Sequence, residues 1–504
     1  MKASSIYMRV ATHILVAAIT CNPAFSFLAS TRPKSPIDRT SQLYSEIPRE
    51  MAQMGFHHDD SSISRKKKKR NQSSLLSAVA IDTPSSFAWG DITRHSDDND
   101  EQPLWSQIQL TLSTALLITG NTVGASCLVL PEMAARPGMT AATALFVGSY
   151  LVNLVSGLII AEVAIKQHDS SGEDPPSSFK EFADANLDLP MAGTIISCIS
   201  LFLNTCIMSF DLTRAGQIVS NFSGMDPFTM SLGFAGLVAS LGMTQNAKNL
   251  SGIASMAVTA LFISFAGLLV PGLANVHDAA AVFATPGTTD FFTGISQAAP
   301  IILMTGVFQN IVPSVTKILD YDRTKVVTAM MLGSALPLCM FVAWCFASIG
   351  GGIGDAAGPL LTAFSLAAVS GSSIGSIMSV SGEIDSFLES SNIDEKQDDE
   401  SHRYSVPAVL LSVAAPLAAA YMFAGGQDGN AALSISGAYG TPLLYGAVPV
   451  AMAWTQRRRL QQATSSNLVP GGSATLGGLG LGALAFMCQE LVQDVSGALG
   501  SVTI

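Results

Sequence analysis

Long apolar stretches divide most of this chain into segments of membrane-spanning length. From residue 105 onward, apolar runs alternate with short polar loops, and runs of about twenty residues are long enough to cross a bilayer as helices. The runs are apolar on all sides, whereas a surface helix of a soluble domain keeps one polar face. The pattern therefore predicts an all-α membrane protein with about eleven transmembrane helices.

The predicted spans follow one another through short connections, and the fourth span is the shortest. If the first ten spans form two consecutive groups of five, the first and the sixth span occupy corresponding positions. The expected bounds are Trp105–Glu132, Met139–Ile165, Leu189–Val219, Phe228–Met243, Leu250–Leu273, Ile295–Leu319, Val326–Ile349, Leu361–Leu388, Val406–Ala424, Ala432–Trp454 and Leu476–Leu499.

Positive charge sets the predicted orientation. If the first span begins inside, the outside loops hold only Arg136, and the other Lys and Arg residues of the loops lie inside. Such an excess of positive charge marks the inner side of a membrane. In a plastid envelope the inner side is the stroma. The inside loops hold Lys166, Lys180, Lys248, Arg323, Lys325, Lys396, Arg403, Arg457, Arg458 and Arg459.

The first hundred residues differ from the rest in composition. Residues 1–24 combine Lys2 and Arg9 with the short apolar run HILVAAIT, which is the layout of a signal peptide. The junction Ala24-Phe25 resembles the cleavage motif of algae with secondary plastids. We therefore predict a signal and transit presequence over residues 1–50, a disordered polar tail over 51–103 and a transporter domain over 104–500. The predicted location is the plastid inner envelope, and the plasma membrane or an endomembrane is the alternative.

Several function classes are disfavoured by what the chain lacks. The basic run at residues 65–70 is isolated and carries no interleaved aromatic residues, so no nucleic-acid partner is expected. The seven cysteines form no CxxC pair, and no histidine lies within a predicted span, so no metal site or cofactor is expected. We see no arrangement of acids, histidines or nucleophiles typical of catalysis and expect no enzyme and no catalytic residues.

The first and sixth predicted spans are interrupted at their middles. The first reads ITGNTVGAS over residues 118–126 before Pro131, and the sixth reads MTGVFQNIVP over residues 304–313. Glycine weakens a helix, and unwound backbone is tolerated at membrane depth only where it lines a cavity or is buried in protein. Two interrupted spans in corresponding positions indicate an inverted-repeat transporter with a binding site at the midplane. A packing kink without a ligand is the alternative.

These residues resemble those of the aromatic and hydroxy amino acid permease family, in particular its plastid-type, tyrosine-specific transporter-like members. The resemblance covers nearly all of residues 105–500 and is strongest over residues 308–344. Two departures from the family pattern stand out: Ser126 replaces a usual Gly, and Gly371-Ser372 replaces a usual Thr-Ser. The other matching stretches are GNTVGASCLVLPEM (120–133), GLIIAEVAI (157–165), FSLAAVSGSSIG (364–375) and GAYGTPLLYGAVPVAMAW (437–454).

The resemblance implies a leucine-transporter-type fold, with two inverted five-helix repeats and one extra helix, as in amino acid/polyamine/organocation-like transporters. It also implies secondary active, alternating-access transport of Tyr, Trp or Phe, usually driven by protons. The partners would be the amino acid, protons and membrane lipids. The alternatives are a transporter of another small amino or organic acid, a transport-derived sensor, or a structural membrane protein.

The two breaks supply the predicted substrate contacts. The α-carboxylate is expected at the backbone N–H groups near Gly120–Gly124, where the following half-helix presents its positive end. The α-ammonium is expected at carbonyls around Thr305–Val307. Phe308 is either an aromatic wall or plain core packing, and Asn121 and Asn310 bind substrate or only repair the helix ends. The predicted substrate-binding set is Gly120, Asn121, Thr122, Gly124, Thr305, Gly306, Phe308, Gln309 and Asn310.

The coupling ion is expected to be the proton. Transporters of this fold can hold sodium between spans one and eight with two span-eight hydroxyls, but here that pair reads Gly371-Ser372, so only Ser372 remains as an ion-coupling candidate. Glu162 is the candidate proton carrier, with bracing of span two as the alternative. Asp211 and Arg214 lie three residues apart and are expected to pair on one helix face.

Overall fold

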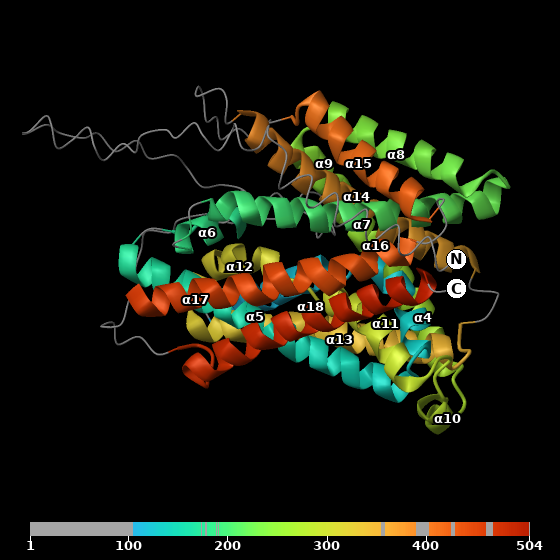
Figure 1. The fold of residues 1–504 in the computed structure, drawn as a ribbon, viewed down its shortest axis with the longest axis horizontal. Helices are drawn as coiled ribbons and strands as arrows, with labels where there is room; N and C mark the ends of the chain where they lie inside the picture. Colours follow the sequence, from blue (N-terminus) through green and yellow to red (C-terminus); the bar gives the residue numbers. More distant parts are fainter. Residues whose placement is uncertain are drawn as a thin grey trace, which may run out of the picture. The chain divides into compact units, whose positions relative to one another are not determined.

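The computed structural model describes residues 104–172, 174–176, 179–187, 189, 191–353, 358–389, 403–424, 429–459 and 467–502. Every regular element within these ranges is a helix, which confirms the predicted all-α class (Figure 1). The predicted presequence over residues 1–50 and the predicted tail over residues 51–103 lie outside the described residues.

Each predicted span coincides with helical structure. Two short helices, α6 (Phe179–Asn186) and α10 (Ala279–Ala284), lie in connections. The helices of the spans, in chain order, are α3 (Leu104–Thr122) with η2 (Ala125–Val129) and α4 (Leu130–Ala135), α5 (Met139–Ser171), α7 (Ala192–Ser223), α8 (Pro227–Thr244), α9 (Ala247–Ala274), α11 (Phe291–Thr305) with η3 (Gln309–Ile311) and α12 (Val312–Ile318), α13 (Arg323–Ile349), α14 (Gly358–Glu389), α15 (Val406–Ala424), α16 (Gly429–Ile435) with η5 (Ser436–Gly440), η6 (Leu443–Ala447) and α17 (Val448–Arg459), and α18 (Gly472–Val502).

The lengths and compositions of these helices suit a membrane. Among the described residues, eight helices are long and apolar enough to cross a bilayer, and the bent pair α3 and α4 brings the number to nine. The ninth predicted span is the shorter apolar helix Val406–Tyr421, and the tenth is divided by the π-helical turns η5 and η6. The chain is therefore an integral membrane protein.

Small residues let the helices approach closely. A methyl group added at Gly333 of α13 would lie 2.7 Å from the carbonyl oxygen of Ala115 on α3. One added at Gly216 of α7 would clash with the carbonyl oxygen of Pro227 on α8. Interfaces between membrane helices are rich in small residues for this reason. These contacts fix α3 against α13 and α7 against α8.

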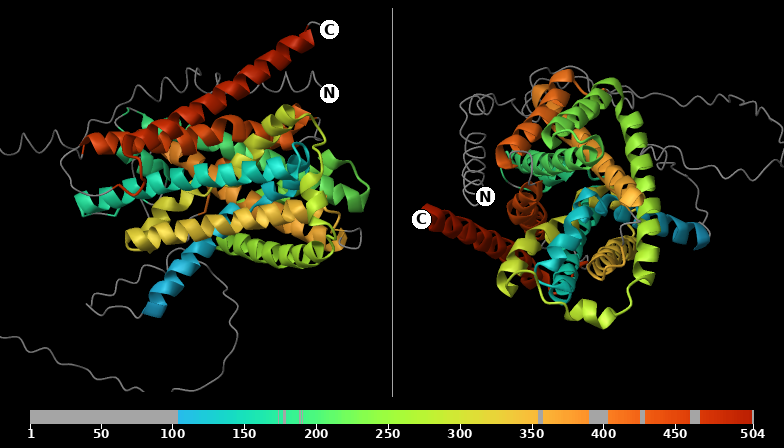
Figure 2. Two further views of the ribbon diagram at one scale, coloured as in Figure 1. Left: turned by 90° about the horizontal axis from the view of Figure 1, so that it is seen from below. Right: turned by 90° about the vertical axis from the view of Figure 1, so that its right-hand side faces the viewer.

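Helix α14 occupies a central position in the packing. It contacts α9 on one side and α7 on another, and it also reaches η2 beside the first break. By contrast, α18 lies along the outside of the helices (Figure 2), and its apolar side chains Leu481 and Val492 are exposed. Large exposed apolar side chains on a peripheral helix are suited to contact with lipid.

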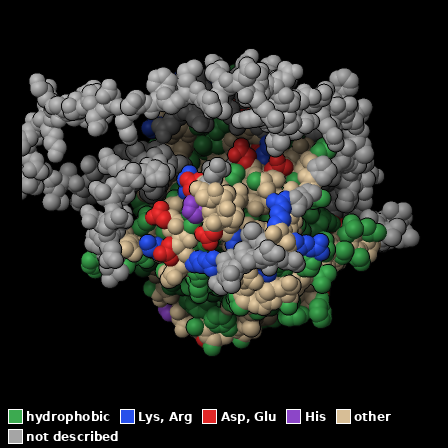
Figure 3. Space-filling model, turned by 90° about the vertical axis from the view of Figure 1, so that its left-hand side faces the viewer, with side chains coloured by type: hydrophobic (Ala, Val, Ile, Leu, Met, Phe, Trp, Pro, Cys, Tyr) green, Lys and Arg blue, Asp and Glu red, His purple; other side chains and the backbone are tan. Residues whose placement is uncertain are grey.

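Lys and Arg side chains gather, together with Asp and Glu side chains, on one end of the described molecule (Figure 3). At this end Lys166 lies on α5, Lys317 on α12, and Arg457 on α17. It is the end predicted from the sequence to face the inner side of the membrane. The two helix breaks lie between this end and the opposite one, near the middle of their spans.

Candidate substrate-binding site at the two helix breaks

The first break separates α3 from η2. Helix α3 ends at Thr122, and the backbone at Gly124 is extended, with φ −132° and ψ −164°. The chain then resumes as a helix over residues 125–135 at an angle of 59° to α3. Pro131 stands in the first turn of α4, where its missing N–H leaves no hydrogen bond unmade. The first N–H groups of the resumed helix have no intrahelical partner and can receive an anion.

The second break has the same arrangement as the first, in which a helix ends, a non-helical segment follows and a helix resumes. Helix α11 ends at Thr305, residues 306–308 are non-helical, and η3 and α12 follow. Pro313 again stands in the first turn of the resumed helix. The Thr305 hydroxyl donates to the carbonyl of Ile301 in its own helix at 2.7 Å. Both breaks therefore lie where the sequence predicts them, and each is followed by a helix with a proline in its first turn.

The side chains of Asn121 and Asn310 connect the two breaks. Nδ2 of Asn121 donates to Oδ1 of Asn310 at 3.0 Å, and Nδ2 of Asn310 lies 3.5 Å from Oδ1 of Asn121. Both side chains are exposed although they lie near the middle of their spans. Gly124 also borders open space, since an added methyl group would meet nothing within 4 Å. Because an amide facing lipid would lack partners, this open space suits a water-filled cavity.

Gln309 points away from that open space and into the protein. Its side chain is fully buried, and Nε2 donates to Oδ1 of Asn153 on α5 at 2.8 Å. Its Oε1 accepts from the backbone N–H of Phe308 at 2.8 Å. Asn153 in turn donates to the carbonyl of Leu303 at 3.1 Å. Gln309 and Asn153 together hold the second break against α5.

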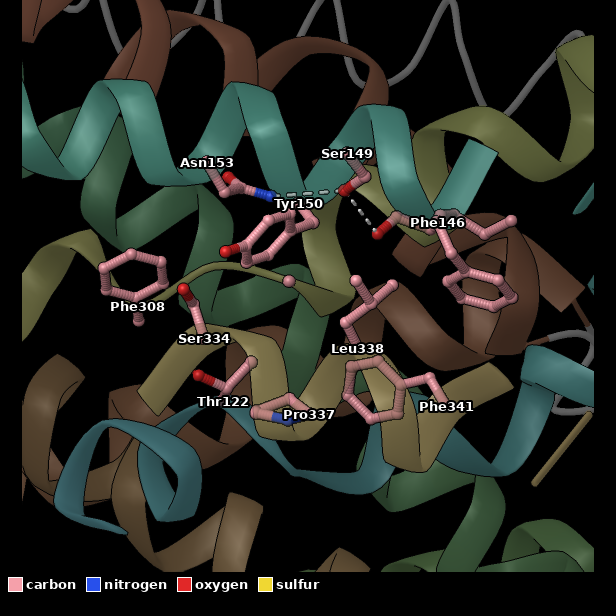
Figure 4. A pocket seen from close by; sticks show the side chains of 12 residues that line it. Thr122, Phe146, Ser149, Tyr150, Asn153, Phe308, Ser334, Pro337, Leu338 and Phe341 are labelled. Carbon is pink, nitrogen blue, oxygen red and sulfur yellow. Dashed lines mark hydrogen bonds between the residues drawn. The ribbon is translucent and has the colours of Figure 1, made fainter. Parts of the chain in front are cut away.

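A small cavity lies on the α5 and α13 side of the breaks (Figure 4). The space open to the centre of a water molecule is about 20 Å³, which is close to the minimum for one ordered water. Its walls mix aromatic rings with hydroxyl and amide groups. The lining residues are Thr122, Phe146, Ser149, Tyr150, Asn153, Ile302, Gly306, Phe308, Ser334, Pro337, Leu338 and Phe341.

Three residues of the predicted substrate-binding set line this cavity: Thr122, Gly306 and Phe308. Phe308 is fully buried, and a methyl group added at Gly157 of α5 would lie 2.9 Å from its ring. A methyl group at Gly306 would lie 2.9 Å from Nδ2 of Asn153, so this glycine allows α5 to approach. The structure thus brings both breaks against α5 as well as against each other.

Sequence reasoning did not single out the α5 side of the site. Ser149 and Asn153 are four residues apart on α5, and the Ser149 hydroxyl donates to the carbonyl of Ile302 at 3.2 Å. The signal was present, because two polar residues at i and i+4 within an apolar span define one polar helix face. Together they satisfy carbonyls in the last turn of α11, before the second break.

Glu162 lies at the basic end of α5, far along the helix from Asn153. Its carboxylate accepts from Lys166 Nζ at 2.8 Å and from Arg457 Nη2 at 2.8 Å. The backbone N–H groups of Leu468 and Val469 also donate to it, at 2.9 and 3.3 Å. The Glu162 side chain is only 2% exposed. This cluster joins α5 to α17 and to the segment that precedes α18.

Val258 of α9 lies beside both Gly120 on α3 and Gly371 on α14. A methyl group added at Gly120 would lie 3.9 Å from Cγ1 of Val258 on α9, and one added at Gly371 would lie 3.7 Å from its Cγ2. Ser372 instead interacts with Asp211 on α7. The predicted pair of Asp211 and Arg214 does not form, because the hydrogen bond of Asp211 goes to Ser373 across the helix contact. Among the described residues, no cluster of three or more His, Cys, Asp or Glu side chains could hold a metal ion.

The model of the tryptophan/tyrosine permease family matches residues 108–353 and 354–489, which include both breaks. The chain belongs to the tryptophan/tyrosine permease family. It is therefore a membrane transport protein rather than an enzyme. The family agrees with the one that the sequence motifs resemble.

Comparison with individual proteins adds one relative. The "Tyrosine-specific transport system 2" protein of Haemophilus influenzae is 26% identical over 246 residues, which make up 48% of this chain and 58% of the relative. The match thus spans a little over half of the relative's length.

Two solved transporter structures align with this chain at low sequence identity. Mhp1 in an inward-facing conformation aligns with a TM-score of 0.47 and 13% identity, over 78% of this chain and 91% of that chain. A manganese transporter from Eremococcus coleocola aligns with a TM-score of 0.45 and 11% identity, over 81% and 99% of the two chains.

Proposed function

We propose that the protein is a secondary active transporter of aromatic amino acids, of the Tyr, Trp and Phe class, which works by alternating access. The observation that carries the proposal is the connection of two broken spans by Asn121 and Asn310, in open space near the middle of the membrane. Family membership and the printed name of the Haemophilus relative support the substrate class. The two breaks in corresponding spans support two inverted five-helix repeats with one extra helix.

The proposed pose uses the two breaks for the two charges of the amino acid. The α-carboxylate, expected from the sequence near Gly120–Gly124, meets the backbone N–H groups that follow Gly124 at the start of the resumed helix. The α-ammonium meets carbonyls of Thr305–Val307. Asn121 and Asn310 border the same open space and contribute amide hydrogen bonds. Phe308 is proposed as the aromatic wall, and its full burial means that α5 or α13 must shift for a ring to reach it.

We propose the proton as the coupling ion. Sodium needs several oxygen ligands to replace its hydration shell, and the methyl groups of Val258 occupy the space between Gly120 and Gly371. Ser372 interacts with the carboxyl group of Asp211 instead. Apolar methyl groups supply no ligand for a cation, so this position supports a sodium-independent transporter.

Glu162, the candidate carrier from the sequence, is held by contacts that favour its alternative role as a brace. Two cations and two backbone N–H groups surround a nearly inaccessible carboxylate. Such partners stabilise the charged form, and protonation would break several of these bonds at once. We therefore propose that Glu162 closes the basic end of the molecule by joining α5 to α17.

The proposed location is the plastid inner envelope, with residues 1–50 as the targeting presequence. A fluorescent protein fused to residues 1–50 is expected to enter plastids of an alga with secondary plastids. The matched control is the same fusion with Phe25→Ala, which is expected to stop in the endoplasmic reticulum. Retention of the unaltered fusion in the endoplasmic reticulum would refute the plastid assignment and favour an endomembrane or the plasma membrane.

Counterflow in liposomes tests transport itself. Purified protein is reconstituted with unlabelled tyrosine inside, and labelled tyrosine, tryptophan, phenylalanine or leucine is added outside. We expect exchange of the three aromatic amino acids and little exchange of leucine. A sensor would bind tyrosine without exchanging it, and a structural membrane protein would do neither. Either of these results would overturn the proposed function.

A further inference from the structure

A buried carboxyl group lies at the contact between α7 and α14, outside the site described above. Asp211 of α7 is 0% exposed, and so is Ser373 of α14. The Ser373 hydroxyl donates to Oδ2 of Asp211 at 3.5 Å, and Ser372 interacts with the same carboxyl group. Oδ1 has no hydrogen-bond partner within the described residues. A buried oxygen of this kind needs either a proton or a cation.

No cation within the described structure pairs with Asp211. Arg214 lies one turn further along α7, but its guanidinium stands over the ring of Phe210 and donates to Gln217 at 3.1 Å. The helices α8, α15 and α16, which pack against α7, contain no Asp, Glu, Lys, Arg or His. An ionised carboxylate in such surroundings would be strongly disfavoured.

The remaining ionisable groups on elements packed against α7 lie far along their helices or have partners elsewhere. On α14, Glu383 is about 15 Å along the helix from Ser373, pairs with Lys180, and is followed by Asp385, which accepts from Ser405. On α6, Asp184 accepts a hydrogen bond from the backbone N–H of Gly193 at the start of α7. Gly193 lies about 27 Å along α7 from Asp211. The others on these elements are Cys198, Cys206, Glu181, Glu389, Tyr421, Tyr439 and Tyr445.

Helix α14 links this carboxyl group to the first break. Gly371 faces Val258, which also lies beside Gly120, whereas the adjacent Ser372 and Ser373 interact with Asp211. The same helix packs against η2, which follows the break. A shift of α14 relative to the first break would therefore change the contacts of Asp211 and its access to water. A carboxyl group whose access to water changes with conformation gains and loses a proton.

We propose that Asp211 is the group that binds and releases the transported proton, with Ser372 and Ser373 as positioning residues. The proposal rests on the proposed function as a proton-coupled transporter. In the buried state Asp211 is a neutral carboxylic acid, and its O–H can donate a hydrogen bond. When the contact opens to water, the O–H bond breaks, the proton passes to water, and the carboxylate is hydrated. Nothing is oxidised or reduced in this step.

Transport assays with Asp211→Asn test the coupling. With the membrane potential held at zero, a one-unit pH gradient supports about tenfold accumulation for one proton per substrate. We expect wild-type protein to approach this value, and Asp211→Asn to show no accumulation while retaining tyrosine counterflow. Asp169→Asn, which alters an exposed carboxylate on α5, is the matched control and is expected to keep wild-type accumulation. Wild-type accumulation by Asp211→Asn, loss of its counterflow, or a purely sodium-driven uptake that Asp211→Asn removes would each overturn the proposal.

An infrared measurement separates this proposal from the proposed function. The carbonyl-stretch band of a protonated carboxylic acid is expected in the wild type at neutral pH and is expected to be reduced in Asp211→Asn but not in Asp169→Asn. An identical band in wild type and Asp211→Asn would overturn the assignment of the proton to Asp211, whether or not transport is observed. Loss of all transport in wild type, with the band intact, would overturn the proposed function and the coupling role, but not the neutral state of Asp211.

Discussion

Asn121 and Asn310 lie 189 residues apart in sequence, and the Nδ2 of Asn121 is 3.0 Å from the Oδ1 of Asn310. This hydrogen bond joins the two breaks directly. Since both side chains are exposed to open space, the net stabilisation is small, about 0.5 kcal/mol. Its importance lies in geometry, because it fixes the distance between the group of N–H donors at one break and the carbonyls at the other.

Removing either amide is expected to impair transport more than stability. Asn121→Ala and Asn310→Ala should each lower kcat/KM for tyrosine by about tenfold, because a misaligned pair of breaks binds the two substrate charges less well. The double variant should lose little more than either single variant, since the two residues act as a unit. Uptake kinetics in liposomes, with thermal unfolding in detergent, provide the measurement.

Asn249→Ala is the matched control for this pair, because Asn249 is an exposed amide that contacts Gln245 at the start of α9. It should leave uptake unchanged. If the effects of the two single variants simply added in the double variant, the two amides would act independently, and the alignment role would be wrong.

Gly124 is expected to matter because of the space beside it. Its backbone is extended and open, so Gly124→Leu should fold with little loss of stability but place a side chain in the open space beside the first break. We expect uptake to fall by at least about tenfold, as substrate loses its place at the N–H groups. Gly148→Leu, at another open position on α5, is the control for added bulk and should transport normally. Normal uptake by Gly124→Leu would remove the carboxylate site from this break.

A different outcome is expected at Gly306. A methyl group there would approach Nδ2 of Asn153 to 2.9 Å, so Gly306→Ala should destabilise the protein by about 1–3 kcal/mol through overpacking. Thermal unfolding measures this loss directly. Equal stability of Gly306→Ala and wild type would show that Asn153 moves freely, against the close contact between α5 and the second break.

The sequence predicted the span positions and both breaks because these depend on local composition. Twenty apolar residues specify a span wherever it packs, and Gly with small polar residues weakens a helix whichever neighbour it has. Gly124 and Gly306 therefore lie at the breaks, whereas Gly120 lies within the last turn of α3. Thr122 and Phe308 also line the cavity, as expected of residues beside the unwound segments.

Partners across helices could not be predicted in the same way. The contact of Gln309 with Asn153 joins residues 156 apart, and helical periodicity does not state which helix faces which. For the same reason the sequence suggested Arg214 as the partner of Asp211, although the helix contact presents Ser373 instead. The placement of Val258 between Gly120 and Gly371 likewise depends on three helices that only the fold brings together.

The cluster around Glu162 is expected to be essential for stability. Glu162→Gln would leave Lys166 and Arg457 without the carboxylate that they share, at a cost of about 3–5 kcal/mol. Thermal unfolding should show a large decrease in Tm. Asp169→Asn, which affects an exposed carboxylate on the same helix, should change Tm little. A Tm equal to wild type in Glu162→Gln would show that the cluster does not brace α5 against α17.

Asp174, in the connection after α5, makes a pH-dependent contribution to the stability of the folded protein. The hydrogen bond from Lys317, at 3.1 Å, lowers the pKa of Asp174 below its usual value. Asp174 thus binds a proton less well in the folded protein than in the unfolded chain. Its contribution to the stability of the folded state is therefore complete above about pH 4 and is lost as the pH falls through the folded-state pKa. Because the Asp174 side chain is half exposed, we expect this contribution to the free energy of unfolding to be less than about 1 kcal/mol. Asp174→Asn should remove this part of the acid dependence of Tm; an unchanged acid profile would contradict it.

The most direct test of the central claim is accumulation of labelled tyrosine by the purified protein in liposomes, with proton and sodium gradients imposed separately. The account predicts that an inward proton gradient alone drives accumulation, that a protonophore abolishes it, and that replacing sodium with choline changes nothing. Accumulation driven by sodium alone, or the absence of tyrosine, tryptophan and phenylalanine accumulation under both gradients, would contradict the account.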